Sequence, residues 1–388
     1  MDAVSVTAAA GFTANGLHCG IKADGVLDLT AVVADRAVSL AAVFTTSATS
    51  APPVRLSRLR AAAGLGRGVI INSGSANAGT GAMGMEDAEA MSAALASQLG
   101  CDPAEVLVCS TGPIGGRLPV GIITASVPDL VGGLGPDAEH ATAAARGMMT
   151  TDTVPKEAVR RFDGWVIGGM SKGAGMIRPD MATMLAVLTT DAVISADTLR
   201  SALRDAVDGT FNALNIDGCQ STNDTVIVMA SGRSGIEPDP AQVADALTEV
   251  CADLALQMAI DAEGASKVVT ITVTGAGSDA DARRIGMTIA DSSLVRSSFY
   301  GADPNWGRVF GAAGVAGVDV DPDSIEIAYD GTVVASGGVG VSVDEDELSS
   351  RLEGDFEVSV AVGDGPGSAR IVTTDLTPDY VVFNGERS

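Results

Sequence analysis

The segment Lys172-Gly-Ala-Gly-Met-Ile-Arg-Pro-Asp-Met-Ala-Thr-Met-Leu185 places Thr183 after a small residue, Ala182, just behind a glycine-rich turn. A threonine hydroxyl is a poor nucleophile until a base takes its proton, and that base is usually a nearby histidine. The chain has only two histidines, His18 and His140, and neither stands in a recognisable catalytic motif. Thr183 therefore needs a different base if it is to act as a nucleophile.

Cleavage of the peptide bond before Thr183 would supply such a base, because the freed α-amino group would lie next to the hydroxyl. An α-amino group titrates at about 7.7–8.0 in model compounds. That range is close to the working pH that general-base catalysis favours. The alternative interpretation is that residues 181–190 form a buried apolar segment in which Thr183 only fills a slot. The motif by itself leaves both interpretations open.

Further motifs follow one another over most of the chain. Before the threonine they are Asn72-Ser-Gly-Ser-Ala-Asn-Ala78, Ser110-Thr-Gly-Pro-Ile-Gly115 and Met149-Thr-Thr-Asp-Thr-Val-Pro-Lys156. After it come Ser221-Thr-Asn-Asp-Thr225, Glu263-Gly-Ala-Ser-Lys267, Asp303-Pro-Asn-Trp-Gly-Arg308 and Asp375-Leu-Thr-Pro-Asp-Tyr380, followed by Asn384. In order and spacing, these motifs resemble the glutamate N-acetyltransferase / ornithine acetyltransferase family of arginine biosynthesis.

The resemblance implies a chain that cleaves itself between Ala182 and Thr183. The α chain, residues 1–182, would carry the oxyanion hole and part of the substrate pocket. The β chain, residues 183–388, would begin with the nucleophilic threonine and supply the rest of the pocket. The implied fold is α/β (α+β), a sandwich of β-sheets and helices shared with self-processing aminopeptidases. Residues from both sides of the cut would form one intertwined αβ unit.

The resemblance also implies the reaction. Thr183 would take the acetyl group of N-acetylornithine, release ornithine and pass the acetyl group to glutamate, in a double displacement with an acetyl-enzyme intermediate. No cofactor is implied, although acetyl-CoA is a further candidate co-substrate. Members of the family usually assemble as dimers or higher oligomers of the αβ unit, which predicts an α2β2 or larger assembly.

Site residues are carried over from the family position by position. The oxyanion donors correspond to Thr111 and Gly112, and the substrate-binding residues to Thr150, Lys172, Thr183, Glu263, Asn384 and Ser388. Lys172 suits a substrate carboxylate and Glu263 suits the amine of ornithine. Several positions also have an ordinary structural interpretation. Thr111 and Gly112 could form a simple strand-to-turn transition. Glu263 could be a solvated carboxylate at a helix end, and Asn384 and Ser388 could belong to a frayed C-terminus.

Composition restricts the class of protein. Of the 388 residues, 46% are hydrophobic and only 3% aromatic, which predicts a core of small aliphatic side chains. The chain has no apolar run of about 18 residues and no basic segment followed by a long apolar run. We therefore expect a cytoplasmic protein without membrane contact. The formal net charge of −25 argues against nucleic acid as a partner, because phosphates require a basic surface.

Lysine and cysteine usage give further indications. Only Lys22, Lys156, Lys172 and Lys267 are lysines among 24 basic residues, and the last three of them lie inside the motifs. Where arginine supplies most of the positive charge, a retained lysine suggests a need for a compact ammonium group. Coincidence and surface placement are the alternative, and they suit Lys156 better than Lys172. The five cysteines contain no CxxC pair, so neither a disulfide framework nor a metal site is predicted.

Hydrophobic periodicity and turn residues predict short strands and several helices along the chain. Strands are expected at residues 69–71, 106–109, 165–168, 267–273, 356–362, 370–373 and 380–383, with a hairpin over 325–335 around Asp330-Gly331. Helices are expected at 85–99, ended by Gly100, from the cap Ser195 to 207, and over 239–262.

Three departures from the family pattern leave the preferred acyl donor open. The chain has Asp217-Gly-Cys-Gln220 where Asp-Gly-Asp-Thr is common, Arg296-Ser297 in place of Lys-Thr, and Ala262-Glu-Gly264 in place of Gly-Glu-Gly. Two other functions therefore stay as alternatives. One is the same machinery acting on another N-acyl amino acid in secondary metabolism. The other is a self-processed aminopeptidase or amidase that passes the acyl group to water.

Overall fold

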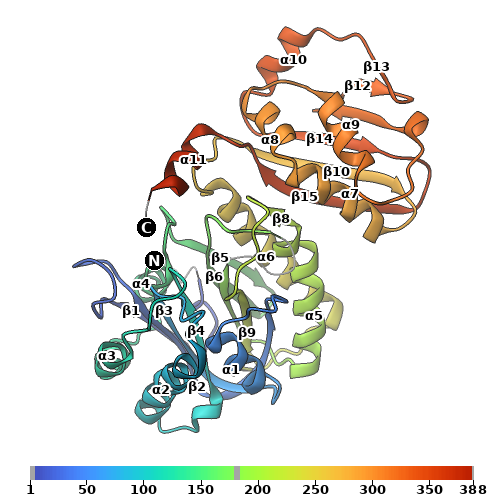
Figure 1. The fold of residues 1–388 in the computed structure, drawn as a ribbon. Helices are drawn as coiled ribbons and strands as arrows, with labels where there is room; N and C mark the ends of the chain where they lie inside the picture. The colour runs from blue at the N-terminus through green and yellow to red at the C-terminus, as the bar shows by residue number, and fades with distance from the viewer. Residues whose placement is uncertain (1–4, 179–183, 387–388) are drawn as a thin grey trace. The chain divides into compact units, whose positions relative to one another are not determined.

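The computed structural model describes residues 5–178 and 184–386, and the chain divides into two compact units. Unit 1 comprises residues 1–212 and 219–258, and unit 2 comprises residues 213–218 and 259–388. Each unit has a β-sheet of its own, covered by helices (Figure 1). The predicted α/β fold of sheets and helices is confirmed.

Unit 1 is built on an eight-stranded mixed sheet in the order β4-β3-β2-β9-β7-β6-β5, with β1 paired to β2. Its strands are β1 Phe12–Leu17, β2 Leu29–Phe44, β3 Leu65–Ser73, β4 Val106–Thr111, β5 Lys156–Phe162, β6 Trp165–Lys172, β7 Leu185–Thr190 and β9 Thr225–Ala230. The long strand β2 has a break in register between Val33 and Val38. Its first part pairs with β1 and β3, and its last part pairs with β9.

Strands from both sides of the predicted cut alternate in this sheet. β7 and β9 follow residue 183, yet they lie between β2 and β6, which precede it. β7 pairs with β6 antiparallel and with β9 parallel. The two predicted chains would therefore share one hydrogen-bonded sheet, and the expected intertwining is confirmed within unit 1.

Helices cover both faces of the unit 1 sheet. The helices of this unit are α1 Pro52–Ala61, α2 Gly81–Leu99, α3 Val120–Gly132, α4 Ala138–Met148, α5 Ala196–Gly209 and α6 Pro240–Ile260, with a 3-10 turn η1 at Pro103–Glu105. α1, α2 and α3 bury their apolar sides on one face of β2, β3 and β4 (Figure 1). α4 packs on the opposite face with a second cluster of buried side chains. Because aromatic residues are few, both clusters consist mainly of Ala, Val, Ile, Leu and Met.

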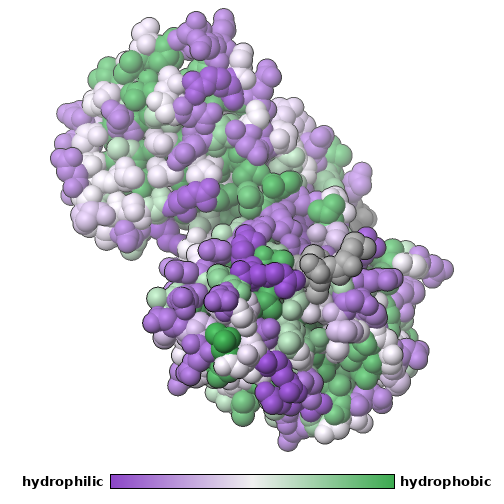
Figure 2. Space-filling view, turned by 180° about the vertical axis from the view of Figure 1, so that it is seen from behind, coloured by the Kyte–Doolittle hydropathy of each residue, from purple (hydrophilic) through white to green (hydrophobic). Residues whose placement is uncertain are grey.

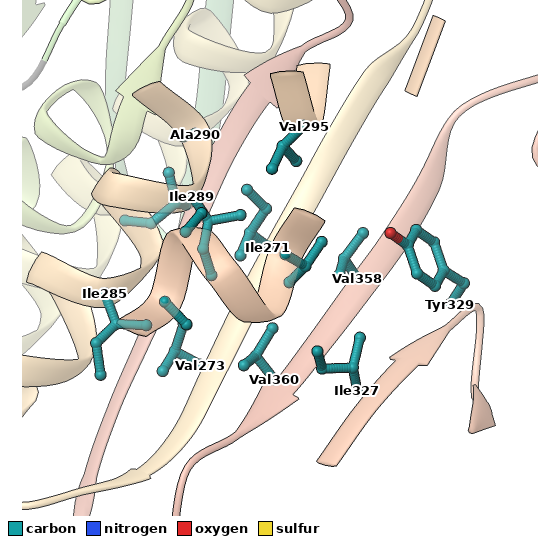
Figure 3. Close-up of a cluster of buried hydrophobic side chains, with 14 of the residues drawn as sticks. Ile271, Val273, Ile285, Ile289, Ala290, Val295, Ile327, Tyr329, Val358 and Val360 are labelled. Carbon is teal, nitrogen blue, oxygen red and sulfur yellow. The ribbon is translucent and has the colours of Figure 1, made fainter. Parts of the chain in front are cut away.

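Unit 2 has a seven-stranded sheet in the order β13-β12-β11-β14-β10-β15-β8. Its strands are β8 Leu214–Asn215, β10 Val268–Ala276, β11 Glu326–Tyr329, β12 Thr332–Ser336, β13 Val339–Gly340, β14 Phe356–Ala361 and β15 Gly367–Thr374. Its helices are α7 Asp279–Asp291, α8 Ser293–Tyr300, α9 Trp306–Gly314, α10 Glu345–Arg351 and α11 Pro378–Gly385, and 3-10 turns lie at η2 Phe211–Ala213 and η3 Pro322–Ser324. Figure 3 shows Ile285 and Ile289 of α7 in one cluster with Ile271, Val358 and Val360 of the central strands.

Most expected elements are present and are longer than predicted, except that α6 and β14 are slightly shorter than the predicted ranges 239–262 and 356–362. Gly100 ends α2 in a left-handed conformation, with φ of 64°. The side chain of Ser195 caps α5 by accepting the N–H of Thr198. Asp330 and Gly331 both have positive φ in the turn between β11 and β12, as a two-residue hairpin of this kind requires.

The strand predicted at residues 380–383 is wrong, because these residues belong to helix α11. The side chain of Thr377 accepts the N–H of Tyr380, and Pro378 stands in the first turn of the helix. Both are helix-start features, and they outweigh the short apolar run that suggested a strand.

Hydrophobic and hydrophilic side chains are interspersed over the described residues on the face that Figure 2 draws. In residues 5–178 and 184–386, the helices are all too short or too polar to cross a membrane.

Candidate active site

The predicted oxyanion donors lie where β4 ends. Thr111 is the last residue of this buried strand, and its carbonyl accepts the N–H of Ser75 at 3.0 Å. Gly112 has a φ of +136°, and a Cβ at this position would lie 2.5 Å from the nitrogen of Ser75. Only glycine therefore allows the loop that begins with Gly74 to approach so closely. This turn is held more tightly than an ordinary strand end.

Asp152 is the centre of a buried polar cluster. Its Oδ1 accepts Nζ of Lys156 at 2.7 Å and the N–H of Gly173 at 2.6 Å. Its Oδ2 accepts the N–H of Thr150 at 3.0 Å and lies 4.0 Å from Nζ of Lys172. Two predicted substrate-binding residues, Thr150 and Lys172, are thus connected through one carboxylate that the sequence analysis did not single out.

The charges in this cluster are coupled. Burial by itself raises the pKa of Asp152, but the ammonium groups of Lys172 and Lys156 outweigh burial and lower that pKa to about 2. Asp152 therefore stays ionised at neutral pH. Lys156 is fully buried, which excludes the surface placement that was its alternative interpretation.

Lys22 adds a third ammonium group. Its Nζ donates to the carbonyl of Met149 at 2.6 Å and to that of Leu27 at 3.0 Å. Burial lowers the pKa of Lys22 to about 8, and the nearby charge of Lys172 acts in the same direction. The buried carboxylate of Asp28 shapes this loop by accepting several of its backbone N–H groups, including that of Lys22 at 2.9 Å.

The motif Ser221 to Thr225 reaches two parts of the site. The side-chain amide of Asn223 donates to the carbonyls of Ala76 at 2.7 Å and Ser110 at 2.9 Å. Oδ1 of the fully buried Asp224 accepts the N–H of Met184 at 3.0 Å. Met184 is the residue that follows Thr183 in the chain.

Asp224 has an unusual electrostatic environment. Burial raises its pKa well above the ordinary range, although the N–H of Met184, Lys172 and the hydroxyls of Ser221 and Thr45 act in the opposite direction. Its Oδ2 has no hydrogen-bond partner among the described residues. A carboxyl group in this state holds its proton more readily than an exposed one.

The cleavage residues Ala182 and Thr183, and the terminal Ser388, lie outside the described residues. The structure brings together the chain segments of unit 1 that precede and follow residues 179–183. Lys172 ends β6 before them, and Met184 leads into β7 after them. Their order in the sheet is fixed by the pairing of Lys172 with Leu185.

Glu263 and Asn384 both lie in unit 2, where they contact each other. Nδ2 of Asn384 donates to Oε2 of Glu263 at 3.1 Å. Gly264 has a φ of +64°, and a Cβ there would lie 2.3 Å from the nitrogen of Tyr380, so helix α11 packs against this glycine. The hydroxyl of Thr377 also donates to the carbonyl of Gly264. Asn384 therefore belongs to an anchored helix rather than a frayed end.

Two departures from the family pattern have structural partners. The buried guanidinium of Arg296 donates to the carbonyls of Thr374 and Asp375 and to the hydroxyl of Thr374, at 2.8–3.0 Å. The exposed Gln220 donates to the hydroxyl of Thr46 at 2.9 Å. Lys267 likewise holds main-chain carbonyls in unit 2, with Nζ 3.0 Å from the oxygen of Phe299. The side chains of these three residues thus hold neighbouring parts of the chain by hydrogen bonds.

Most of the residues that sequence reasoning missed were inside motifs it had recognised. Asp152 and Asn223-Asp224 stand in the segments 149–156 and 221–225, but a carboxylate or an amide in a polar turn has an ordinary interpretation as a turn former. Lys22 had only the rarity of lysine as a signal. In the part of the chain that the structure describes, no three His, Cys, Asp or Glu side chains are grouped as a metal site requires.

The fold and the site define the class of this protein as an α/β enzyme, and the charges of the site suit an anionic substrate. Three ammonium groups, from Lys22, Lys156 and Lys172, accompany the ionised carboxylates of Asp152 and Asp28. The three lysines outnumber these two carboxylates, and burial raises the pKa of Asp224. Such a surplus next to a tight glycine turn suits binding of a carboxylate and stabilisation of a developing oxyanion.

Comparison with known proteins identifies the family. The model of the ArgJ family matches residues 13–388. The arginine biosynthesis bifunctional protein ArgJ of Thermobifida fusca is 46% identical over 386 residues, which cover 99% of this chain and 100% of that protein. ArgJ of Mycobacterium tuberculosis strain H37Rv is 45% identical over 402 residues, covering 100% of this chain and 97% of that protein.

A solved structure agrees with this identification. The crystal structure of ArgJ from Bacillus halodurans matches at a TM-score of 0.50 and 36% identity, over 54% of this chain and 99% of the crystallised one. The chain belongs to the ArgJ family. The predicted family and the predicted class of enzyme, an acyltransferase of arginine biosynthesis, are therefore confirmed.

Proposed function

We propose that the protein transfers the acetyl group of N-acetylornithine to glutamate through an acetyl-Thr183 intermediate, after it has cut itself between Ala182 and Thr183. The observation that carries this proposal is the hydrogen bond from the N–H of Met184 to Asp224. Asp224 belongs to the same loop as Asn223, which holds the end of the strand that bears the oxyanion donors. The residue after the nucleophile and the oxyanion donors are thereby connected through two adjacent side chains.

Self-cleavage begins with attack of the Thr183 hydroxyl on the carbonyl of Ala182. The C–N bond breaks, the nitrogen takes the hydroxyl proton, and an ester joins the two residues. Water then hydrolyses the ester to give a carboxylate on Ala182 and a free hydroxyl and α-amine on Thr183. The crystallised Bacillus halodurans chain supports this step, because it spans 54% of this chain, close to the share that residues 183–388 make up.

Acetyl transfer uses the same hydroxyl. The α-amine of Thr183 takes the hydroxyl proton, and the oxygen attacks the acetyl carbonyl of N-acetylornithine. Thr111 and Gly112 donate to the resulting oxyanion, a role whose loss typically costs about 10²–10³ in kcat. The α-amine then returns its proton to the departing nitrogen of ornithine. The amine of glutamate then attacks the acetyl ester of Thr183, the same proton transfers occur in reverse order, and glutamate leaves with the acetyl group.

Substrate recognition follows from the charges of unit 1. Lys172 and Thr150 bind the substrate carboxylate, with Lys156 and Lys22 adding positive potential. The family resemblance adds Glu263, Asn384 and Ser388 as further binding residues, with Glu263 pairing with the substrate amine.

The relatives' description as bifunctional supports a second acetyl donor. We extend the proposal to acetyl-CoA as a co-substrate, with no bound cofactor. The cleaved α and β chains are proposed to assemble as α2β2 or a larger oligomer in the cytoplasm.

The proposal is tested by intact mass and by an acetyl-transfer assay on purified protein with N-acetylornithine and glutamate. We expect two polypeptides, and release of ornithine that depends on glutamate. Thr183→Ala should leave one uncleaved polypeptide without transfer, while the matched variant Thr183→Ser should keep both cleavage and transfer. Full transfer by an unbroken chain, or by Thr183→Ala, would contradict the proposal. Ornithine release without glutamate would indicate an amidase instead.

A further inference from the structure

We infer that Asn223 and Asp224 form a positioning pair that sets Thr183 against the oxyanion donors Thr111 and Gly112. The inference rests on the proposed function, since it concerns the alignment of that nucleophile. Neither side chain is assigned contact with the reacting atoms. Each acts through the backbone segment that it holds.

Asn223 holds the oxyanion side of the site. Its amide uses both of its donors on main-chain carbonyls, those of Ser110 and Ala76. Ser110 directly precedes Thr111, and Ala76 belongs to the loop whose Gly74 and Ser75 press against Gly112. Oδ1 of Asn223 is also used, because it accepts the hydroxyl of Thr222 at 2.6 Å. One buried amide therefore connects the two backbone segments that meet at the oxyanion donors.

Asp224 holds the nucleophile side. Its Oδ1 accepts the N–H of Met184, and the N–H of Thr225 donates to the carbonyl of Met184 at 3.2 Å. Met184 is thus fixed at both its backbone polar groups, one peptide bond away from Thr183. The carbonyl of Asp224 is itself held by the N–H of Thr45 at 3.0 Å. The hydrogen bonds of these two adjacent residues therefore reach both sides of the site.

The energetic cost of Asp224 argues against a purely structural role. Its side chain is completely buried, and Oδ2 has no hydrogen-bond partner among the described residues. A buried acceptor without a partner lowers stability, and a carbonyl or hydroxyl could accept the N–H of Met184 without that cost. The cost of this buried carboxyl group supports a role in holding the N–H of Met184.

The test measures kcat and KM for ornithine release, expressed per cleaved protein as determined by intact mass. Misplacement of reacting groups by about 1 Å can cost around 10²-fold in rate. We expect Asn223→Ala and Asp224→Ala each to lower kcat by about 10–100-fold, with KM changed by less than about threefold. Asp224→Asn should recover most of kcat, because its amide oxygen still accepts the N–H of Met184. The double variant should lose little more than the worse single variant, since both residues maintain one alignment.

Two controls remove a comparable bond elsewhere in unit 1. Asp191 accepts the N–H of Val166 at 2.9 Å, and Asn15 donates to the carbonyl of Leu130 at 2.9 Å. Asp191→Ala and Asn15→Ala should lower the melting temperature but keep kcat within about twofold of the unsubstituted protein. This contrast separates alignment of the nucleophile from general destabilisation.

The inference is overturned if Asn223→Ala and Asp224→Ala keep kcat within about twofold, or if Asp224→Asn loses as much as Asp224→Ala. If Asp224→Ala does not fold, Asp224→Leu, which is branched at Cγ like Asn but cannot accept a hydrogen bond, takes its place. If neither folds, the Asn223→Ala measurement decides alone. Failure of the unsubstituted protein to cleave itself or to transfer acetyl would instead refute the proposed function, whatever these variants do.

Discussion

The interiors of the two units differ in what they bury. The unit 2 core in Figure 3 is a continuous apolar cluster, in which Ile271, Ile289 and Val358 are completely buried. Unit 1 has apolar clusters of its own, but it also buries Asp152 and Asp224 together with lysines. The buried cations of unit 2, Lys267 and Arg296, donate mainly to main-chain carbonyls, and its buried Asp375 accepts main-chain N–H groups.

The buried charges of unit 1 carry a cost in stability. Apolar burial contributes about 25 cal/mol per Å², whereas each buried ion loses several kcal/mol of hydration that its partner only partly returns. A protein that needed only stability would build unit 1 like unit 2. We expect the buried charges of unit 1 to serve the proposed function, whereas the buried charges of unit 2 bind main-chain groups.

The largest effect that separates the two units is expected from removing a buried carboxylate. Asp152→Ala leaves Lys156 and Lys172 without their shared counter-ion and should lower the free energy of unfolding by about 3–5 kcal/mol. Asp375→Ala in unit 2 removes the acceptor for the N–H groups of Ser266 and Lys267 and should cost about 1–3 kcal/mol. Urea unfolding monitored by circular dichroism measures both values. Equal losses in the two variants would refute the comparison.

A smaller effect should appear in the pH dependence of stability. Asp152 has a folded pKa of about 2, below its unfolded value, so its stabilising contribution is complete above about pH 4 and is lost as pH falls towards 2. The contribution is roughly 2–3 kcal/mol.

Asp224 changes the stability of the folded protein with pH in the opposite direction. Its folded pKa is raised, so the folded protein holds a proton that the unfolded chain releases, and stability falls as pH rises above about 4. Asp224→Asn should remove that decline. Urea unfolding of both proteins between pH 4 and 8 provides the measurement, and parallel curves would contradict the raised pKa.

The smallest effect is expected in the unit 2 core. Tyr329 is completely buried, and its hydroxyl has no hydrogen-bond partner within the described part of the chain. Tyr329→Phe should leave the melting temperature unchanged or raise it, because it removes an unsatisfied polar group. Thr190→Val in unit 1, which removes a hydroxyl bonded to the carbonyl of Val166 at 2.8 Å, should instead cost about 1 kcal/mol. A large loss in Tyr329→Phe would show that its hydroxyl has a partner after all.

Much of the fold could be predicted from local patterns. Gly100 as a helix end, Ser195 as a cap and the Asp330-Gly331 turn each depend on a few adjacent residues, and all three are present. The strand predicted at residues 380–383 failed because it also depended on a few adjacent residues only. An apolar run of that length has no period of its own, and the cap at Thr377 decides for a helix.

The sequence by itself determined the family, the class of enzyme and the position of the threonine, because those depend on motifs whose residues are adjacent in the chain. Only the tertiary structure decided that Asp152 joins Thr150 to Lys172, and that Asp224 receives the N–H of Met184 from 40 residues away. A buried carboxylate and an exposed one look alike in a sequence. Burial and the choice of partner depend on how distant strands pair, and those determine both the pKa and the role of the group.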